Sequence, residues 1–232
     1  IQALIQSENP EIAPLKEQFK ALQEEWRNAG QVPQKELKSI QNRYESLGRD
    51  FEKHIKKLMQ QIESRKLEAV EEKCRLCEEI EARLLDNGPL SETEITDYQS
   101  RWNDIANGPK ELDDAVAQRF KQVIDINQSA EKGDADLNSI VSENLLARRE
   151  LCLRIEILAN VDSPAEYVKD RMQYQVSRLE AGMKSARVDP GDELDSIQKQ
   201  WLKTGPIPVA ELPQLKQRFE QARNAARQHI RS

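Results

Sequence analysis

The sequence predicts an all-α protein: an elongated series of tandem helix hairpins and three-helix bundles joined by long coiled-coil-like helices. Three observations predict this fold class. A third of the 232 residues are charged, only 5% are aromatic and only eight are glycine, a composition typical of long helices. One motif recurs three times at a fixed spacing, which indicates tandem repeats. Apolar residues also recur at alternating intervals of three and four, the pattern of a helix that packs against a partner helix.

The repeated motif is Trp, six residues, Pro, nine residues, Arg, and then Tyr or Phe. It uses every tryptophan of the chain, so coincidence is a poor explanation for it. Its members are Trp26, Pro33, Arg43 and Tyr44 in the first repeat; Trp102, Pro109, Arg119 and Phe120 in the second; and Trp201, Pro208, Arg218 and Phe219 in the third.

Each motif predicts a helix hairpin whose corner lies at the proline, with the Trp ring wedged between the two helices. Gly30 and Gly205 follow four residues after their tryptophans, where a left-handed C-terminal cap favours glycine. The proline can begin the second helix, because its missing N–H would have no helical partner there. In the second repeat the glycine is displaced to Gly108, so we expect that corner to be built differently.

A long helix is expected over residues 34–85, where only Gly48 interrupts the helical preference and could mark a kink or a break. The Asp-Asn-Gly-Pro sequence of residues 86–89 ends it. Its apolar positions form a seam that calls for a packing partner. They are Leu37, Ile40, Tyr44, Leu47, Phe51, Ile55, Leu58 and Ile62.

The helix that carries Trp102 begins with a capping box. Ser91 and Glu94 have the spacing of this motif, in which each side chain caps the other residue's backbone N–H. After Phe120, residues 128–136 contain Gly133 and predict an interruption. A further helix is then expected over residues 137–159.

A second capping box is predicted at Ser163 and Glu166, with Pro164 at the first helical position and a helix that runs through Met183. The Val-Asp-Pro-Gly sequence of residues 188–191 breaks that helix before the last Trp helix begins.

The helices that lead into the second and third motifs resemble each other. Leu-Cys-Glu-Glu-Ile-Glu at residues 76–81 aligns with Leu-Cys-Leu-Arg-Ile-Glu at residues 151–156, so Cys77 matches Cys152. The distance to the next Trp is longer in the third unit, which therefore carries one extra helix. We expect three domains: repeat 1 at 1–70, N-terminally truncated; repeat 2 at 71–135; and repeat 3, with the extra helix, at 136–232.

These tandem motifs, with a glycine in the gap before the proline, resemble the bacterial helical-repeat family catalogued as domain of unknown function 349. The resemblance covers nearly the whole chain and is loosest in repeat 2, where the glycine is displaced. It implies a bacterial, cytoplasmic protein built of tandem copies. It provides no catalytic residue to carry over.

Catalytic and metal-binding constellations are sparse. Cys74 and Cys77 could face the same way on a helix, but a structural zinc site needs about four ligands and no second pair matches them. The chain has only two histidines, so it offers few candidates for the base of a catalytic triad, and it contains no phosphate loop or hydrolase motif. We therefore expect no enzymatic activity, no cofactor and no metal. Three cysteines indicate reduced thiols in the cytoplasm.

The charge pattern leaves two classes of partner open. The net charge is −6, yet residues 34–66 hold nine basic against five acidic residues, and residues 213–232 hold five against one. We expect a scaffold or adaptor that binds another protein; the alternative is an RNA- or ribosome-associated factor with basic helical faces. No apolar stretch is long enough for a membrane span. Self-association through the long seam is a further alternative, because an unmatched seam would expose an apolar stripe.

The candidate partner-binding residues are arginines. The motif arginines could brace a neighbouring helix through a carboxylate, which we favour, or form a row of guanidinium groups that reads phosphates or acidic partners. The C-terminal arginines share one helical face. The full set is Arg43, Arg119, Arg218, Arg223, Arg227 and Arg231.

Overall fold

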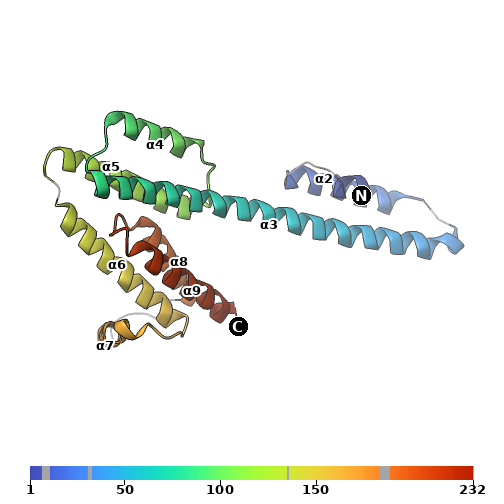
Figure 1. The fold of residues 1–232 in the computed structure, drawn as a ribbon. Helices are drawn as coiled ribbons and strands as arrows, with labels where there is room; N and C mark the ends of the chain where they lie inside the picture. The colour runs from blue at the N-terminus through green and yellow to red at the C-terminus, as the bar shows by residue number, and fades with distance from the viewer. Residues whose placement is uncertain (7–10, 31–32, 135, 183–188, 232) are drawn as a thin grey trace. The chain divides into compact units, whose positions relative to one another are not determined.

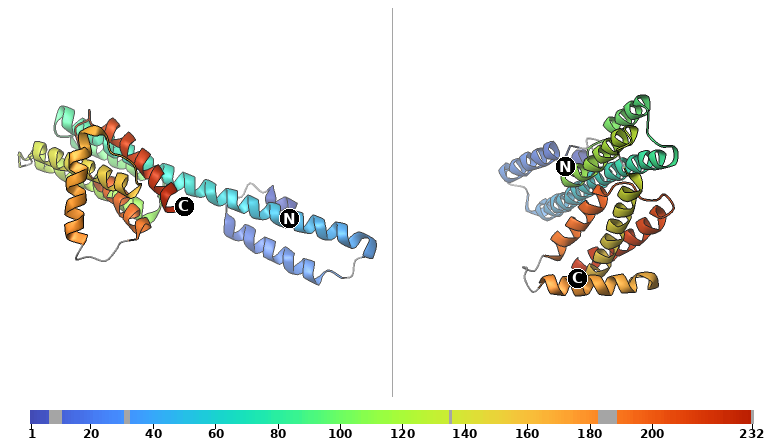
Figure 2. Two further views of the ribbon diagram at one scale, coloured as in Figure 1. Left: turned by 90° about the horizontal axis from the view of Figure 1, so that it is seen from below. Right: turned by 90° about the vertical axis from the view of Figure 1, so that its left-hand side faces the viewer.

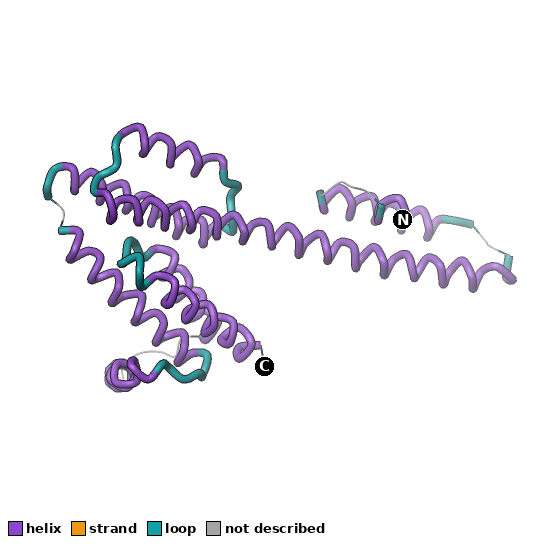
Figure 3. Tube along the Cα trace, in the orientation of Figure 1, coloured by secondary structure: helices purple, strands orange, loops and turns teal. Residues whose placement is uncertain are grey.

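The structure is a computed structural model that describes residues 1–6, 11–30, 33–134, 136–182 and 189–231. Every regular element in these residues is helical (Figure 3), which confirms the all-α prediction. In chain order (Figure 1) the elements are α1 (Gln2–Ile5), α2 (Ile12–Asn28), α3 (Gln34–Asn87), α4 (Glu92–Asp104), α5 (Lys110–Glu131), α6 (Leu137–Leu158), the 3₁₀ turn η1 (Ala165–Tyr167), α7 (Val168–Gly182), α8 (Pro190–Lys203) and α9 (Leu212–Arg231).

The chain divides into two compact units, Ile1–Leu67 and Glu68–Ser232, and α3 contributes residues to both. The second unit contains the residues of both predicted repeats 2 and 3. None of the helices in the described part of the chain is long and apolar enough to cross a membrane.

In the first unit, α1, α2 and the first part of α3 share a small core. Leu15, Phe51 and Ile55 are buried there, and the rings of Phe19 and Phe51 stack with their centroids 4.1 Å apart. The helix α3 continues through Gly48 without a break, which settles the two alternatives that the sequence left open at this position. Its apolar seam is therefore matched within the unit around Phe51, where α1 and α2 cover it.

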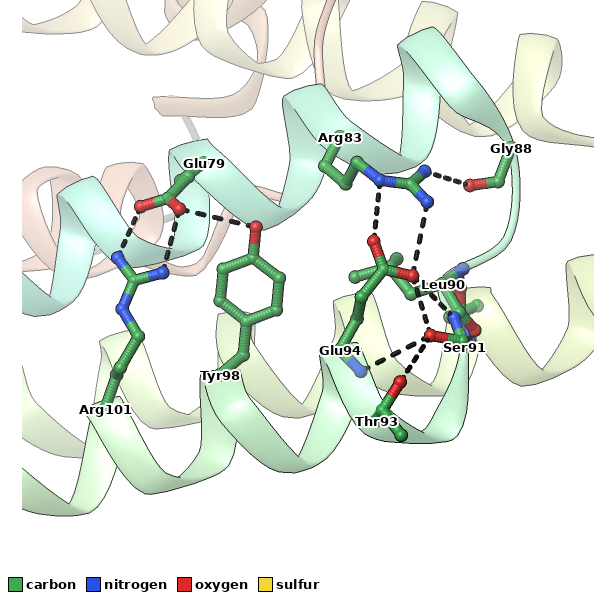
Figure 4. Close-up of polar contacts among 10 residues, drawn as sticks. Glu79, Arg83, Gly88, Leu90, Ser91, Thr93, Glu94, Tyr98 and Arg101 are labelled. Atoms are coloured by element: carbon green, nitrogen blue, oxygen red, sulfur yellow. Dashed lines mark hydrogen bonds and ion pairs between the residues drawn. The ribbon is translucent and has the colours of Figure 1, made fainter.

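The capping box predicted at the start of α4 is confirmed (Figure 4). The backbone N–H of Glu94 donates to the Ser91 hydroxyl, and the Ser91 backbone N–H donates to the Glu94 carboxylate. That carboxylate also accepts from Arg83 of α3, whose guanidinium donates to the Gly88 carbonyl as well. Gly88 has a φ of +76°, so glycine is required at this turn.

The hydrogen bonds between Arg83 and Glu94 form one clasp between α3 and α4, and a second clasp joins α3 to the other end of α4 (Figure 4). Arg101 donates two hydrogen bonds to the Glu79 carboxylate, at 2.8 and 2.6 Å, and the Tyr98 hydroxyl donates to the same carboxylate. Between the clasps, Tyr98 is buried with Leu84 in the core of this bundle.

The interruption predicted after α5 is present and short. α5 ends at Glu131, and Gly133 adopts a φ of +75° that favours glycine. α6 begins at Leu137 as predicted, and the Asp136 carboxylate caps it by accepting two backbone N–H groups. In the rest of the unit, α6, α8 and α9 form the largest core, which includes Ile155 and Trp201.

The three hairpin corners correct the sequence prediction. The residue that ends each Trp helix is the third after Trp, namely Ala29, Ile105 or Thr204, and all three are extended, with ψ of 126°, 132° and 125°. Gly30 and Gly205 do not have the left-handed φ expected of a cap. The second corner was expected to differ because its glycine is displaced. It begins in the same way as the other two, because the residue that ends each helix is extended and does not have to be glycine.

The start of the helix predicted after Ser163 also differs from its prediction. The Ser163 hydroxyl donates to Glu156 of α6 instead of capping the next helix, so the predicted box with Glu166 does not form. A 3₁₀ turn, η1, follows before α7 begins. Met183, the predicted end of this helix, lies outside the described residues. The extra helix of repeat 3 is α7, which runs crosswise to α6 (Figures 1 and 2).

Candidate functional site

In all three motifs the Trp ring stacks on the aromatic ring that follows the arginine. The ring centroids are 4.4 Å apart for Trp26–Tyr44, 4.4 Å for Trp102–Phe120 and 4.0 Å for Trp201–Phe219. Such a pair adds about 0.5–1.5 kcal/mol beyond its buried area. Each stack thus joins the two helices of a hairpin close to its corner.

The motif arginines of repeats 2 and 3 lie inside the fold. Arg119 donates two hydrogen bonds to Glu81, at 2.7 and 2.6 Å, and its side chain is only 2% exposed. Arg218 donates in the same way to Glu156 and is 8% exposed. Both carboxylates come from the helix that leads into the motif, at the aligned sixth position of the two Leu-Cys segments. The geometry is the bracing that the sequence analysis favoured.

Electrostatics hold these guanidinium groups in their charged form. Burial alone would lower the pKa of Arg119, but the Glu81 carboxylate offsets this and holds the pKa above its ordinary value. The pKa of Arg218 is raised in the same way by Glu156. The Arg218 guanidinium also lies over the Tyr167 ring of η1, with 4.0 Å between the guanidinium carbon and the ring centroid.

In repeats 2 and 3, a second cation, in addition to the motif arginine, lies over the Trp ring. Lys73 Nζ is 5.1 Å from the Trp102 centroid, and the Arg148 guanidinium carbon is 4.5 Å from the Trp201 centroid. Both cations are buried and stand eight residues before the bracing glutamate of their own helix. Lys73 also pairs with Asp113 at 2.8 Å.

Arg148 lacks such a carboxylate partner among the described residues. It donates to the Thr204 carbonyl at 2.8 Å, and its Nε has no hydrogen-bond partner in the described part of the structure. Burial, with Arg119 nearby, lowers the pKa of Arg148 to about 10. The group is therefore still a cation at neutral pH: the Trp201 ring and the Thr204 carbonyl contact it, and the Glu81 and Glu78 carboxylates favour its charge without forming an ion pair with it.

The remaining candidate arginines are placed differently. Arg43 is exposed and, within the described residues, makes no ion pair or hydrogen bond. In α9, Arg223 is half-buried, whereas Arg227 is exposed and donates to Gln198 at 3.0 Å. Arg231 ends the helix, and its side chain lies outside the described residues.

Sequence reasoning missed two groups in repeats 2 and 3: the cation that lies over the Trp ring and the carboxylate that pairs with the motif arginine. The constant interval of 18 residues between Trp and the aromatic ring was a signal for stacking, because it is the same in all three motifs. The signal for the cation and the carboxylate was the aligned pair of Leu-Cys helices. Both segments carry Lys or Arg three residues before Leu and Glu five residues after it.

The most exposed apolar surface in the second unit lies on α7. Four side chains at helical spacing share one face of this helix and are exposed, with Met172 at 63% and Leu179 at 72%. Elsewhere on α7, Arg171 donates to the Val161 carbonyl, and Tyr167 of η1, directly before α7, lies against the Arg218 guanidinium. We call this exposed face the α7 stripe, and its residues are Val168, Met172, Val176 and Leu179.

A cavity of about 450 Å³ lies beside the third brace. Glu156, Arg218 and Ser163 line it, and the Ser163 hydroxyl donates to the Glu156 carboxylate. The Ser163 hydrogen bond therefore ties the loop before η1 to α6, and the ion pair joins α9 to the same carboxylate.

The three cysteines are free thiols, and Cys77 and Cys152 are fully buried. Burial raises the pKa of Cys74 to about 11 and that of Cys152 to about 12, and it raises the pKa of Cys77 as well. Cys77 packs with Val116 in one core cluster, and Cys152 packs in another. Among the described residues, no group of three or more His, Cys, Asp or Glu side chains is placed to hold a metal ion.

Comparisons of the chain with protein-family models, with curated proteins and with solved structures found no match.

Proposed function

We propose that this chain is a non-enzymatic helical scaffold or adaptor of the bacterial cytoplasm that binds another protein through the α7 stripe. The observation that carries the proposal is the exposure of four apolar side chains along one face of a helix. Surface apolar residues are ordinary when scattered, but a contiguous row on one helix is typical of a docking surface.

The place of α7 in the repeat supports the proposal. It is the helix that repeat 3 has and repeat 2 lacks, and the cores of both bundles are complete without its apolar face. Among the described residues, the stripe is therefore not part of a buried core. An inserted helix that leaves an apolar face in water lowers solubility, and a binding role explains why it is tolerated.

Charge at the edges of the stripe indicates the chemistry of the partner. Helical geometry places Lys169 along one edge and Arg178 along the other, whereas Arg171 is already held by the Val161 carbonyl and Ser163. A matching surface has an apolar centre with acidic edges. The occupant that we propose is an amphipathic helix of a partner protein that carries Asp or Glu beside its apolar row.

Affinity capture from lysate of the native host tests the function. The intact protein is compared with the double variant Met172→Glu, Leu179→Glu, each with and without ribonuclease, and retained proteins are identified by mass spectrometry. Because both side chains are exposed, the variant should fold normally. We expect a defined protein to be retained by the wild type, to persist after ribonuclease and to be lost from the variant.

A matched control places the same charges elsewhere on α7. The double variant Gln173→Glu, Ser177→Glu adds two carboxylates outside the stripe and should retain the partner. Retention that disappears with ribonuclease, or that is equal in the stripe variant and the wild type, would contradict the proposal. The first of these results would favour the RNA-associated alternative, with mutagenesis then directed to the arginines of α9.

A further inference from the structure

The first half of α3 presents a row of cations to solvent. Each of the five side chains is exposed, and the residues are Lys35, Lys38, Arg49, Lys53 and Lys56. At 3.6 residues per turn they lie within about 60° of one another around the helix axis. The row is about 30 Å long, because each residue of a helix rises about 1.5 Å. We call these residues the α3 basic row.

The α3 basic row lies on the side of α3 opposite its packed seam. Phe51 and Leu58 belong to the core that α3 shares with α1 and α2, and helical geometry places them on the far side of the helix from the row. Within the described residues, Lys53 has one contact with Asp50, at 3.9 Å, and the other four cations make no ion pair. The positive charge of the row is therefore open to a partner in solution.

The fold does not require cations at these positions. When repeats 1 and 2 are aligned at their motif prolines, three cations of the row correspond to acidic residues: Lys35 to Glu111, Lys38 to Asp114 and Arg49 to Asp125. With these acidic residues, repeat 2 still forms its hairpin and its Trp–aromatic stack. The positive charge is thus a property of repeat 1 and not of the hairpin.

The residues between the cations indicate the chemistry of the partner. Along the row, the intervening positions include Asn42 and Ser46, and none is aromatic or apolar. A helix that lies on a membrane buries apolar side chains in it, and a single-stranded nucleic acid stacks its bases on aromatic rings. Neither contact can form here. The row therefore favours the outer phosphates of a nucleic-acid duplex.

The predominance of lysine favours RNA over DNA as this duplex. Sequence readout in the DNA major groove relies on bidentate pairs, for which Arg, Asn and Gln have the geometry. Lysine instead binds phosphate as a point charge. Double-stranded RNA is recognised mostly by its shape, through phosphates and 2′-hydroxyl groups. Asn42 and Ser46 can form hydrogen bonds with such hydroxyl groups.

We propose that the α3 basic row is a docking surface for double-stranded RNA, distinct from the α7 stripe. The five cations contact phosphates along the duplex, and Asn42 and Ser46 contact sugar hydroxyl groups. Glu45 and Glu52 are exposed along one edge of the row, so the duplex lies toward the opposite edge, away from these carboxylates. Binding of this kind depends on charge and shape and does not select a base sequence.

Fluorescence anisotropy tests the proposal with the intact protein and a labelled RNA duplex of about 16 base pairs, the span of a double-stranded-RNA-binding domain. Five phosphate contacts predict a slope of about −4.5 for the logarithm of the binding constant against that of the salt concentration. The double variant Lys38→Gln, Lys53→Gln should bind at least about tenfold more weakly at about 50 mM salt, with a slope smaller in magnitude by about 2. Glu52→Lys should tighten binding, because it removes a repulsive charge beside the row.

A matched control makes the same charge change elsewhere in the first unit. Lys16 and Lys20 are exposed on α2, so Lys16→Gln, Lys20→Gln should fold normally and leave both the affinity for RNA and the slope unchanged. The α7 stripe variant should also bind the duplex as the wild type does. Failure of one site is therefore distinguishable from failure of the other.

Several results would overturn the proposal. They are the absence of RNA binding, wild-type affinity in the α3 double variant, and an equal loss of affinity in the α2 control. A DNA duplex of the same sequence that binds as tightly as the RNA would overturn the assignment to RNA, since charge alone would then determine binding. Binding that Arg223→Gln abolishes and the α3 double variant retains would place the RNA on α9 instead.

Discussion

At the scale of single residues, the same motif arginine lies in two different environments. Arg119 and Arg218 are each buried against one carboxylate with two hydrogen bonds, whereas Arg43 is exposed. A buried pair gains little over an apolar pair of the same shape, but loss of one partner leaves an unpaired buried charge. The brace therefore specifies which helices pack together more than it adds to stability.

Removal of one brace should be costly. We expect Arg218→Met to lower the free energy of unfolding by about 3–5 kcal/mol, because the buried Glu156 carboxylate would lose the cation that neutralises it. The matched change Arg43→Met should cost less than about 0.5 kcal/mol, as at other exposed positions. Urea unfolding followed by circular dichroism measures both. The double variant Arg218→Met, Glu156→Leu should recover most of the loss; if it does not, the ion pair is not the origin of the effect.

Acid should weaken the clasp between α3 and α4. The hydrogen bonds from Arg101 hold the pKa of Glu79 below its ordinary value of 4.5. Since the folded-state pKa is the lower one, this clasp stabilises the protein above the unfolded pKa, and the contribution is lost as pH falls through the folded value. Urea midpoints measured between about pH 6 and pH 3 should fall less steeply for Glu79→Gln than for the wild type. Parallel curves would exclude this carboxylate as a source of acid sensitivity.

At the scale of elements, α3 is one helix where a glycine raised the expectation of a break. The backbone at Gly48 is helical, and a Cβ there would lie 3.9 Å from the Phe19 ring, an ordinary contact. Gly48→Ala should therefore stabilise the protein by about 0.5–1 kcal/mol, the usual gain in a helix interior. A destabilised variant in thermal unfolding would show instead that α3 needs glycine for a bend.

The elements show which features sequence can predict. The capping box at Ser91 and the break at Gly133 were predicted correctly, because each depends on a few adjacent residues. Pro190 and Gly191, which were predicted to lie in a break, instead begin α8. The Ser163 box was not predicted correctly either, since Glu156 of another helix takes the Ser163 hydroxyl. Local patterns fail where a distant group competes for the same side chain.

The same distinction applies to the candidate sites. The motif residues were found from their spacing, but the partners of Arg119 and Arg218 lie 38 and 62 residues away along the chain. No residue near the arginine marks its partner, and the only signal lies in the alignment of the two distant Leu-Cys helices. The exposure of the α7 stripe was also beyond prediction, because apolar spacing on a helix does not reveal whether a neighbour covers it.

At the scale of the whole molecule, the cysteines report on burial in the second unit. Cys77 and Cys152 are fully buried, and Cys74 is half-buried with its pKa raised to about 11. Since the thiolate is the reactive form, we expect all three thiols to react with Ellman's reagent only slowly in the folded protein and rapidly in urea. Fast reaction of any thiol under native conditions would show that its helix is more open than the structure indicates.

Binding of a partner protein through α7 can be located on the chain by hydrogen–deuterium exchange, with the intact protein measured alone and in complex with the captured partner. We predict slower exchange of the amides in residues 168–182 on binding and unchanged exchange in α4, which lies outside the stripe. Unchanged exchange in α7, with protection confined to residues 223–231 of the basic C-terminal helix, would contradict binding through the α7 stripe.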